Sequence, residues 1–132
     1  MILGKVNILL IEDDLTDVTL IKRQIEKVVS KPKILHVSGF QEFIDAMELF
    51  KPDIIISDYQ LKGFTGLEVL RYLQKSNNEI PFLFVTGTIN DEELAENTIL
   101  TNADGYILKG NINQLHEKLE AYFQKILVNK SN

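Results

Sequence analysis

The chain contains no cysteine, which excludes disulfide bonds, thiolate zinc sites and thiol nucleophiles. It is also short of positive charge: 14 Lys and Arg against 19 Asp and Glu give a net charge of -5. A nucleic-acid surface would need a basic stripe instead. The opening apolar run, residues 1–11, is too short and too soon followed by acids to be a signal peptide or a membrane span. We therefore expect a cytoplasmic protein with no nucleic-acid or membrane partner.

Histidine is equally sparse, with His36 and His116 far apart and nothing to mark them as a metal pair. What is present is ordinary for a globular protein: 132 residues, 45% hydrophobic and 25% charged. We expect a single domain over residues 1–132, with a core from about 5 to 127. Five short apolar runs predict buried strands: Val6–Ile11, Ile34–Val37, Ile54–Ser57, Phe82–Val85 and Gly105–Leu108.

Helical periodicity fills the intervals between these strands. The first helix is expected to begin after Asp14, a good N-cap, and to end at Lys31–Pro32. A fourth helix would be capped by Asn90 or Asp91, and the last would leave a frayed tail at Val128–Asn132. Strand and helix thus alternate five times with short connections. This pattern predicts an α/β fold with a doubly wound, five-stranded parallel sheet in the flavodoxin-like order 2-1-3-4-5.

Acidic residues follow two strands that are neighbours in this order. Glu12 and Asp13 come after the first strand, and Asp58 comes after the third. Because the carboxyl ends of parallel strands share one edge, three carboxylates would crowd together there. A hard divalent cation such as Mg²⁺ (or Mn²⁺) would neutralise them with oxygen ligands. A carboxylate beside such a cation can act as a nucleophile and form an acyl phosphate.

The other strand ends supply groups that a phosphoryl product would need. Thr86 can donate its hydroxyl hydrogen to a phosphoryl oxygen, and Lys109 can place an ammonium beside it. Gly87 would let backbone and ligand approach closely. Each residue alone is unremarkable in a turn or cap, but complementary chemistry at four strand ends favours a phosphoryl-transfer site.

These residues lie in segments that closely resemble the receiver domain of two-component response regulators. The resemblance runs from about residue 5 to residue 127 and rests on five segments: Leu9–Asp13 (LLIED), Ile54–Asp58 (IIISD), Gly66, Val85–Gly87 (VTG) and Ala103–Lys109 (ADGYILK). It implies a phosphoprotein of two-component phosphorelay signal transduction. Such a domain is not a conventional enzyme, but it catalyses its own Mg²⁺-dependent phosphorylation and dephosphorylation.

The resemblance also assigns roles to individual residues. Asp58 would accept a phosphoryl group from the phosphohistidine of a sensor histidine kinase or a histidine phosphotransfer protein. Asp13 and Asp58 would bind Mg²⁺ directly, Glu12 through water, and Gln60 through its backbone carbonyl. Thr86 and Lys109 would sense and hold the phosphoryl group.

Tyr106 falls where the family often has an aromatic switch residue. If Thr86 moved towards the phosphoryl oxygens, the Tyr106 ring could fill the space and change the surface of helix four, strand five and helix five. A half-buried packing aromatic is an equally good interpretation of Tyr106.

The chain departs from the family pattern after its lysine and after its phosphoacceptor loop. Gly110 replaces the usual proline, whose preceding peptide bond is often cis in the family. A cis bond before a residue other than proline costs about 2.5–4 kcal/mol, which favours a trans bond and a looser loop, but the sequence does not decide between cis and trans. Leu61 and Lys62 replace the usual Met-Pro, which places a cation near the mouth of the site. Gln60 and Thr88 would border the path of the attacking water, and we expect them to tune self-dephosphorylation.

Other classes fit less well. A haloacid-dehalogenase-like phosphatase needs a second acid two residues after its nucleophile, and this position holds Gln60. A flavodoxin-like cofactor binder needs a phosphate-cradling loop after the first strand, where Glu12 and Asp13 would repel phosphate. The length leaves no room for an output domain, so we expect either a stand-alone receiver or one excised from a larger hybrid kinase or response regulator. It would be a monomer or a phosphorylation-dependent dimer, with an output partner that the sequence does not identify.

Overall fold

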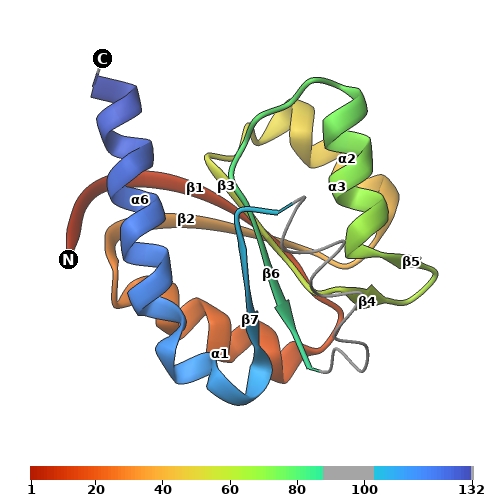
Figure 1. Ribbon diagram of the computed structural model, residues 1–132, viewed down its shortest axis with the longest axis horizontal. Helices are drawn as coiled ribbons and strands as arrows, with labels where there is room; N and C mark the ends of the chain where they lie inside the picture. Colours follow the sequence, from red (N-terminus) through yellow and green to blue (C-terminus); the bar gives the residue numbers. More distant parts are fainter. Residues whose placement is uncertain (88–102, 132) are drawn as a thin grey trace.

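The computed structural model describes residues 1–87 and 103–131. Thr88 and the predicted fourth helix, with its cap at Asn90 or Asp91, lie outside the described residues. Five parallel strands form one sheet in the order β2-β1-β3-β6-β7, which confirms the predicted order 2-1-3-4-5 (Figure 1). The strands are β1 (Ile2–Ile11), β2 (Val29–Val37), β3 (Ile54–Ser57), β6 (Phe82–Thr86) and β7 (Gly105–Leu108).

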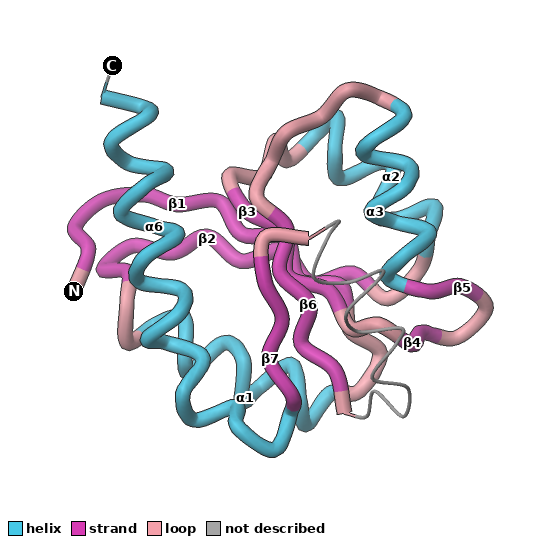
Figure 2. Tube along the Cα trace, viewed as in Figure 1, coloured by secondary structure: helices cyan, strands magenta, loops and turns pink. Residues whose placement is uncertain are grey.

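Helices cover both faces of this sheet (Figures 1 and 2). On one face lie α1 (Leu15–Glu26) and α6 (Leu115–Ser131), and on the other lie α2 (Phe40–Leu49) and α3 (Gly66–Lys75). A 3₁₀ segment, η2 (Lys109–Gln114), joins β7 to α6. A two-stranded hairpin, β4 (Gln60–Leu61) with β5 (Phe64–Thr65), precedes α3. Among the described residues, no helix combines the length and the apolar character needed to cross a membrane.

The sheet separates two hydrophobic clusters, and its central strands contribute to both. In β1, Ile8 and Leu10 join the cluster beneath α1 and α6, whereas Leu9 and Ile11 join the cluster beneath α2 and α3. Every residue of β3 is buried. A strand buried on both faces needs apolar side chains at successive positions, which explains the unbroken runs in the sequence. The ends of these central strands are therefore fixed by side-chain packing on both faces of the sheet.

Two predicted boundaries are wrong. The first helix ends at Glu26, and Pro32 lies inside β2 rather than closing the helix. Because β2 is the outermost strand, it can hold a proline whose missing N–H is not required by a further strand. The tail expected to fray is instead helical as far as Ser131.

Candidate functional site

The three predicted carboxylates meet at the carboxyl edge of the sheet. Glu12 and Asp13 follow β1, and Asp58 follows β3, whose last residue pairs with Ile11. The Asp58 N–H donates a hydrogen bond of 2.9 Å to the Ile11 carbonyl, so the ladder between the two strands continues to the site. Glu12, Asp13 and Asp58 each offer a carboxylate oxygen, and these oxygens lie within 4.8 Å of one another. We call these three residues the acidic cluster.

Glu12 is the most buried member of the acidic cluster, with 1% of its side chain exposed. Its Oε1 accepts a hydrogen bond of 2.6 Å from Lys109 Nζ. Its Oε2 is buried and has no hydrogen-bond partner among the residues that the structure describes. Burial raises the pKa of Glu12 to about 8; the Lys109 ammonium opposes this shift, and the neighbouring Asp58 reinforces it. The charged form of Glu12 is therefore only partly stabilised by Lys109.

Lys109 begins η2 and reaches three carboxylates at once. Its Nζ lies 2.6 Å from Glu12 Oε1, 2.6 Å from Asp17 Oδ2 and 3.1 Å from Asp58 Oδ2. Burial alone would lower the pKa of Lys109, but the hydrogen bonds to Asp17, Glu12 and Asp58 outweigh it and raise the pKa above its usual value. Lys109 is thus a firmly protonated cation at Asp58. Its peptide bond to Gly110, which the sequence left open between cis and trans, is trans.

The β4–β5 hairpin closes one side of the site. The Lys62 N–H donates a hydrogen bond of 2.9 Å to Asp13 Oδ2, so backbone after Asp58 helps to fix Asp13. Gln60 is the first residue of β4, and its side chain is exposed. The role of its backbone carbonyl as a metal ligand stays a prediction.

Gly66, the first residue of α3, packs directly beneath Asp58. A Cβ at this position would stand 2.3 Å from the Asp58 carbonyl oxygen and 2.6 Å from Phe84 Cε1. Its N–H donates a hydrogen bond of 2.7 Å to the Tyr59 carbonyl. Thr65 and Glu68 form a capping box that fixes this end of α3. A glycine is therefore needed at this position because the α3 backbone touches the Asp58 backbone.

Thr86 ends β6 and is buried at the same edge of the sheet. It pairs in register with Leu108, the residue before Lys109. Gly87 follows, and a Cβ there would lie 3.7 Å from Lys109 Cδ. The structure therefore brings the predicted hydroxyl and the predicted cation to adjacent strand ends.

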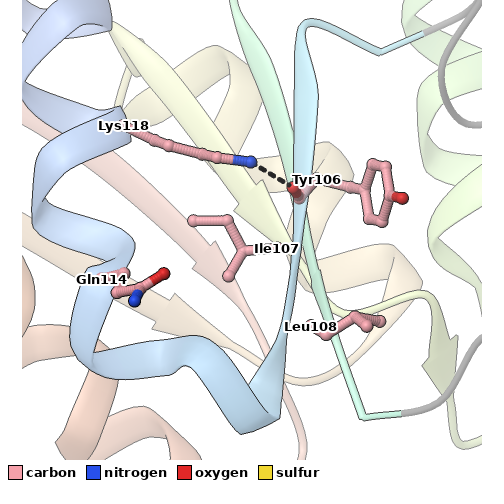
Figure 3. A pocket seen from close by; sticks show the side chains of 5 residues that line it. All are labelled: Tyr106, Ile107, Leu108, Gln114 and Lys118. Atoms are coloured by element: carbon pink, nitrogen blue, oxygen red, sulfur yellow. Dashed lines mark hydrogen bonds between the residues drawn. The ribbon is translucent and has the colours of Figure 1, made fainter.

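Tyr106 lies in the middle of β7 and is half-buried. Its ring points away from α6, whereas Ile107 points towards it (Figure 3). The Tyr106 carbonyl accepts a hydrogen bond of 3.1 Å from Lys118 Nζ on α6. A cavity of about 210 Å³ separates this part of β7 from α6, lined by Tyr106, Ile107, Leu108, Gln114 and Lys118. This setting fits both interpretations of Tyr106, the switch and the packing aromatic.

The acidic cluster suits a hard divalent cation. It provides three oxygen donors, and one buried carboxylate oxygen, Glu12 Oε2, has no partner among the described residues. Magnesium takes oxygen ligands at about 2.0–2.1 Å and keeps several waters, so a cluster of a few carboxylates is enough. The residues that could hold it are Glu12, Asp13 and Asp58.

Sequence reasoning missed two residues at the site. Asp17 contacts Lys109, and nothing in the sequence marks it, since an acid in the first turn of a helix is ordinary. His36, on a strand that carried no evident functional group, is half-buried and forms a hydrogen bond of 2.6 Å between its Nε2 and the Glu12 carbonyl. No pattern in the sequence joins His36 to Glu12, because the contact depends on how β1 and β2 pair.

Comparison with known proteins gives a consistent result. The family model described as the response regulator receiver domain matches residues 8–120. The response regulator protein GraR of Staphylococcus epidermidis is 30% identical over 120 residues, which cover 90% of this chain and 52% of that protein. The chain thus spans about half the length of this curated relative.

Solved structures show the same fold. The signal receiver domain of a LuxO repressor protein from Vibrio parahaemolyticus superposes with a TM-score of 0.82 at 23% identity, covering 96% of each chain. A two-component response regulator from Clostridium difficile gives a TM-score of 0.78 at 21% identity, covering 92% of this chain and 98% of the other.

Proposed function

Since the chain belongs to the response regulator receiver domain family of two-component signalling, we propose that Asp58 is its phosphoacceptor. The observation that carries this proposal is the arrangement around Asp58, a nearly buried carboxylate at the end of β3. Lys109 lies 3.1 Å from its Oδ2, and two further acids complete the cluster. The donor would be the phosphohistidine of a sensor histidine kinase or of a histidine phosphotransfer protein in the cytoplasm.

Asp58 would act as the nucleophile. A carboxylate oxygen attacks the phosphorus, an O–P bond forms as the P–N bond to the histidine breaks, and the histidine nitrogen keeps the electron pair. With the other ring nitrogen of the phosphohistidine protonated, the products are an acyl phosphate and a neutral imidazole. The Asp58 backbone is fixed by its hydrogen bond to the Ile11 carbonyl and by packing against Gly66, and Lys109 donates a hydrogen bond of 3.1 Å to its carboxylate. Such positioning is the main contribution a protein makes to phosphoryl transfer.

Lys109 and Thr86 would bind the transferred group. The Lys109 ammonium already lies at Asp58, so it can offset the negative charge that develops on the phosphoryl oxygens. Thr86 would donate its hydroxyl hydrogen to one of these oxygens from the end of the neighbouring strand.

The acidic cluster would hold Mg²⁺ or Mn²⁺ through Glu12, Asp13 and Asp58, with the Gln60 carbonyl as a further ligand. When bound, the cation would supply positive charge that lowers the repulsion between these carboxylates and the phosphoryl oxygens. The buried Glu12 Oε2, which has no hydrogen-bond partner within residues 1–87 and 103–131, supports this assignment.

Signal output would pass through Tyr106. Movement of Thr86 towards the phosphoryl group would let the Tyr106 ring turn inward, altering a surface made by β7, α6 and the chain between β6 and β7. The half-buried position of Tyr106 against the hydrophobic cluster beneath α2 and α3 supports this proposal, since the ring can be buried further.

The test is incubation with acetyl phosphate and Mg²⁺, followed by mass spectrometry of the intact protein. We expect a mass gain of one phosphoryl group that requires Mg²⁺ and is lost in Asp58→Asn. The matched control is Asp45→Asn, which removes an exposed carboxylate from α2 and should leave phosphorylation unchanged. Unaltered phosphorylation of Asp58→Asn, or rapid turnover of many phosphomonoesters, would overturn the proposal.

A further inference from the structure

Lys109 binds one acid that the acidic cluster does not contain. Two of its three carboxylate partners, Glu12 and Asp58, are also members of the cluster. The third, Asp17, lies outside the cluster, yet its Oδ2 is 2.6 Å from Lys109 Nζ. The ammonium has three N–H donors, and these three carboxylates are enough to engage all of them. Asp17 therefore binds Lys109 but does not belong to the candidate metal site.

This division matters when a divalent cation is present. The cation and the ammonium would both draw on Glu12 and Asp58, and their like charges would repel. A lysine side chain is long and flexible and can leave a site when its partners are taken by another cation. Asp17 is the one of the three partners for which the cation would not compete, so it can retain Lys109 at the site.

Asp17 is well placed for this task because its backbone is fixed. It belongs to the first turn of α1, where its N–H donates a hydrogen bond of 3.1 Å to Asp14 Oδ1. The Thr16 N–H donates a second bond of 2.9 Å to the same oxygen, so Asp14 caps the helix firmly. The Asp17 side chain is 21% exposed, and that of Lys109 is 19% exposed. The pair thus lies at the rim of the site, beside the buried Glu12.

We propose that Asp17 is a positioning residue that keeps the Lys109 ammonium beside Asp58 while a divalent cation occupies the acidic cluster. Asp17 touches neither the cation nor the phosphoryl group in this arrangement and acts through Lys109. The inference rests on the proposed function, because Lys109 needs to stay at Asp58 only if Asp58 receives a phosphoryl group.

The first experiment measures Mg²⁺ binding by calorimetry, without any phosphoryl donor, in a double-mutant cycle. Asp17→Asn should weaken Mg²⁺ binding about five-fold, because Lys109 then competes harder for Glu12 and Asp58; such a factor corresponds to about 1 kcal/mol of coupling. In a Lys109→Gln background the same substitution should change binding less than about two-fold. Equal weakening in both backgrounds would show a simple loss of negative charge and overturn the proposal. The matched control is Glu42→Gln, which removes the first-turn acid of α2 and should leave Mg²⁺ binding unchanged.

The second experiment measures the rate of phosphorylation by acetyl phosphate at saturating Mg²⁺. Here a loss of metal affinity no longer matters, so a further drop of about five-fold in Asp17→Asn reports on the position of Lys109. Asp17→Glu, which keeps the carboxylate, should recover part of the rate. A rate that is unchanged or faster in Asp17→Asn would overturn the inference even if Lys109→Gln does not fold. If the unsubstituted protein takes up no phosphoryl group, the proposed function itself fails, which is a different result.

Discussion

Replacing Gly66 by alanine should destabilise the protein and disturb its site at the same time. The new Cβ would stand 2.3 Å from the Asp58 carbonyl oxygen and 2.6 Å from Phe84 Cε1, with Ser57 Oγ at 3.1 Å. Neither of the two nearest atoms can turn away, since one is backbone and the other belongs to a fully buried ring. The start of α3 or the end of β3 must therefore shift.

The size of the effect follows from two opposed contributions. Inserting a methyl group into close-packed structure typically costs about 1–3 kcal/mol, and contact with backbone places Gly66→Ala at the upper end of that range. Alanine is better than glycine in a helix by at most about 1 kcal/mol, which offsets part of the loss. A net destabilisation of about 2 kcal/mol should lower the unfolding midpoint by roughly 6–10 °C for a domain of this length.

Thermal unfolding followed by circular dichroism measures this shift. Gly110→Ala is the matched control, because a Cβ at Gly110 would meet no atom within 4 Å. This substitution should change the free energy of unfolding by less than about 1 kcal/mol. Phosphorylation of Gly66→Ala should also slow at a temperature where it stays folded, since the Asp58 backbone has moved. If Gly66→Ala and Gly110→Ala unfold at the same temperature, the close packing of α3 against Asp58 does not constrain the site as described.

Three further outcomes are expected. The pKa of Glu12 is raised from 4.5 to about 8 on folding, so its contribution to stability is fully present below pH 4.5 and is lost as the pH rises through about 8. The urea midpoint in EDTA should therefore fall over this range, and Glu12→Gln should flatten that fall. Lys109→Met leaves the buried Glu12 without its cation and should lower the free energy of unfolding by about 1–3 kcal/mol in EDTA at pH 8.5. This is less than for a fully buried pair because Lys109 is 19% exposed. Added Mg²⁺ should restore most of this stability, and a failure to do so would argue against metal binding at the acidic cluster. Thr65→Ala removes the capping box of α3 and should cost about 1 kcal/mol in urea unfolding, whereas Thr19→Ala on the exposed side of α1 should stay within about 0.5 kcal/mol.

The strand order and the acidic cluster could be predicted from the sequence because both depend on simple rules. Apolar runs in regular alternation with helices predict a parallel sheet, and parallel strands collect their terminal residues at one edge. This rule alone predicted the cluster of Glu12, Asp13 and Asp58, and the structure brings their carboxylate oxygens within 4.8 Å of one another. Lys109 followed in the same way from the end of β7.

The remaining features depend on how separate elements pack. The extension of β2 across Pro32 could not be read locally, since a proline ends a helix but is tolerated in an outer strand. The contact of Asp17 with Lys109 requires α1 and the start of η2 to lie side by side, which no spacing within α1 reveals. That Glu12 Oε2 finds no hydrogen-bond partner in the described part of the chain likewise depends on how several elements pack around it.

The composition of β2 also has a consequence for self-association. This strand forms one edge of the sheet, and its exposed Lys31 and Lys33 flank Pro32. A second chain that tried to add a strand there would meet two like charges and a residue without an N–H to donate. Continuous growth of the sheet from this side is therefore disfavoured. A dimer of this protein is thus more readily formed through its helices or loops than through the β2 edge.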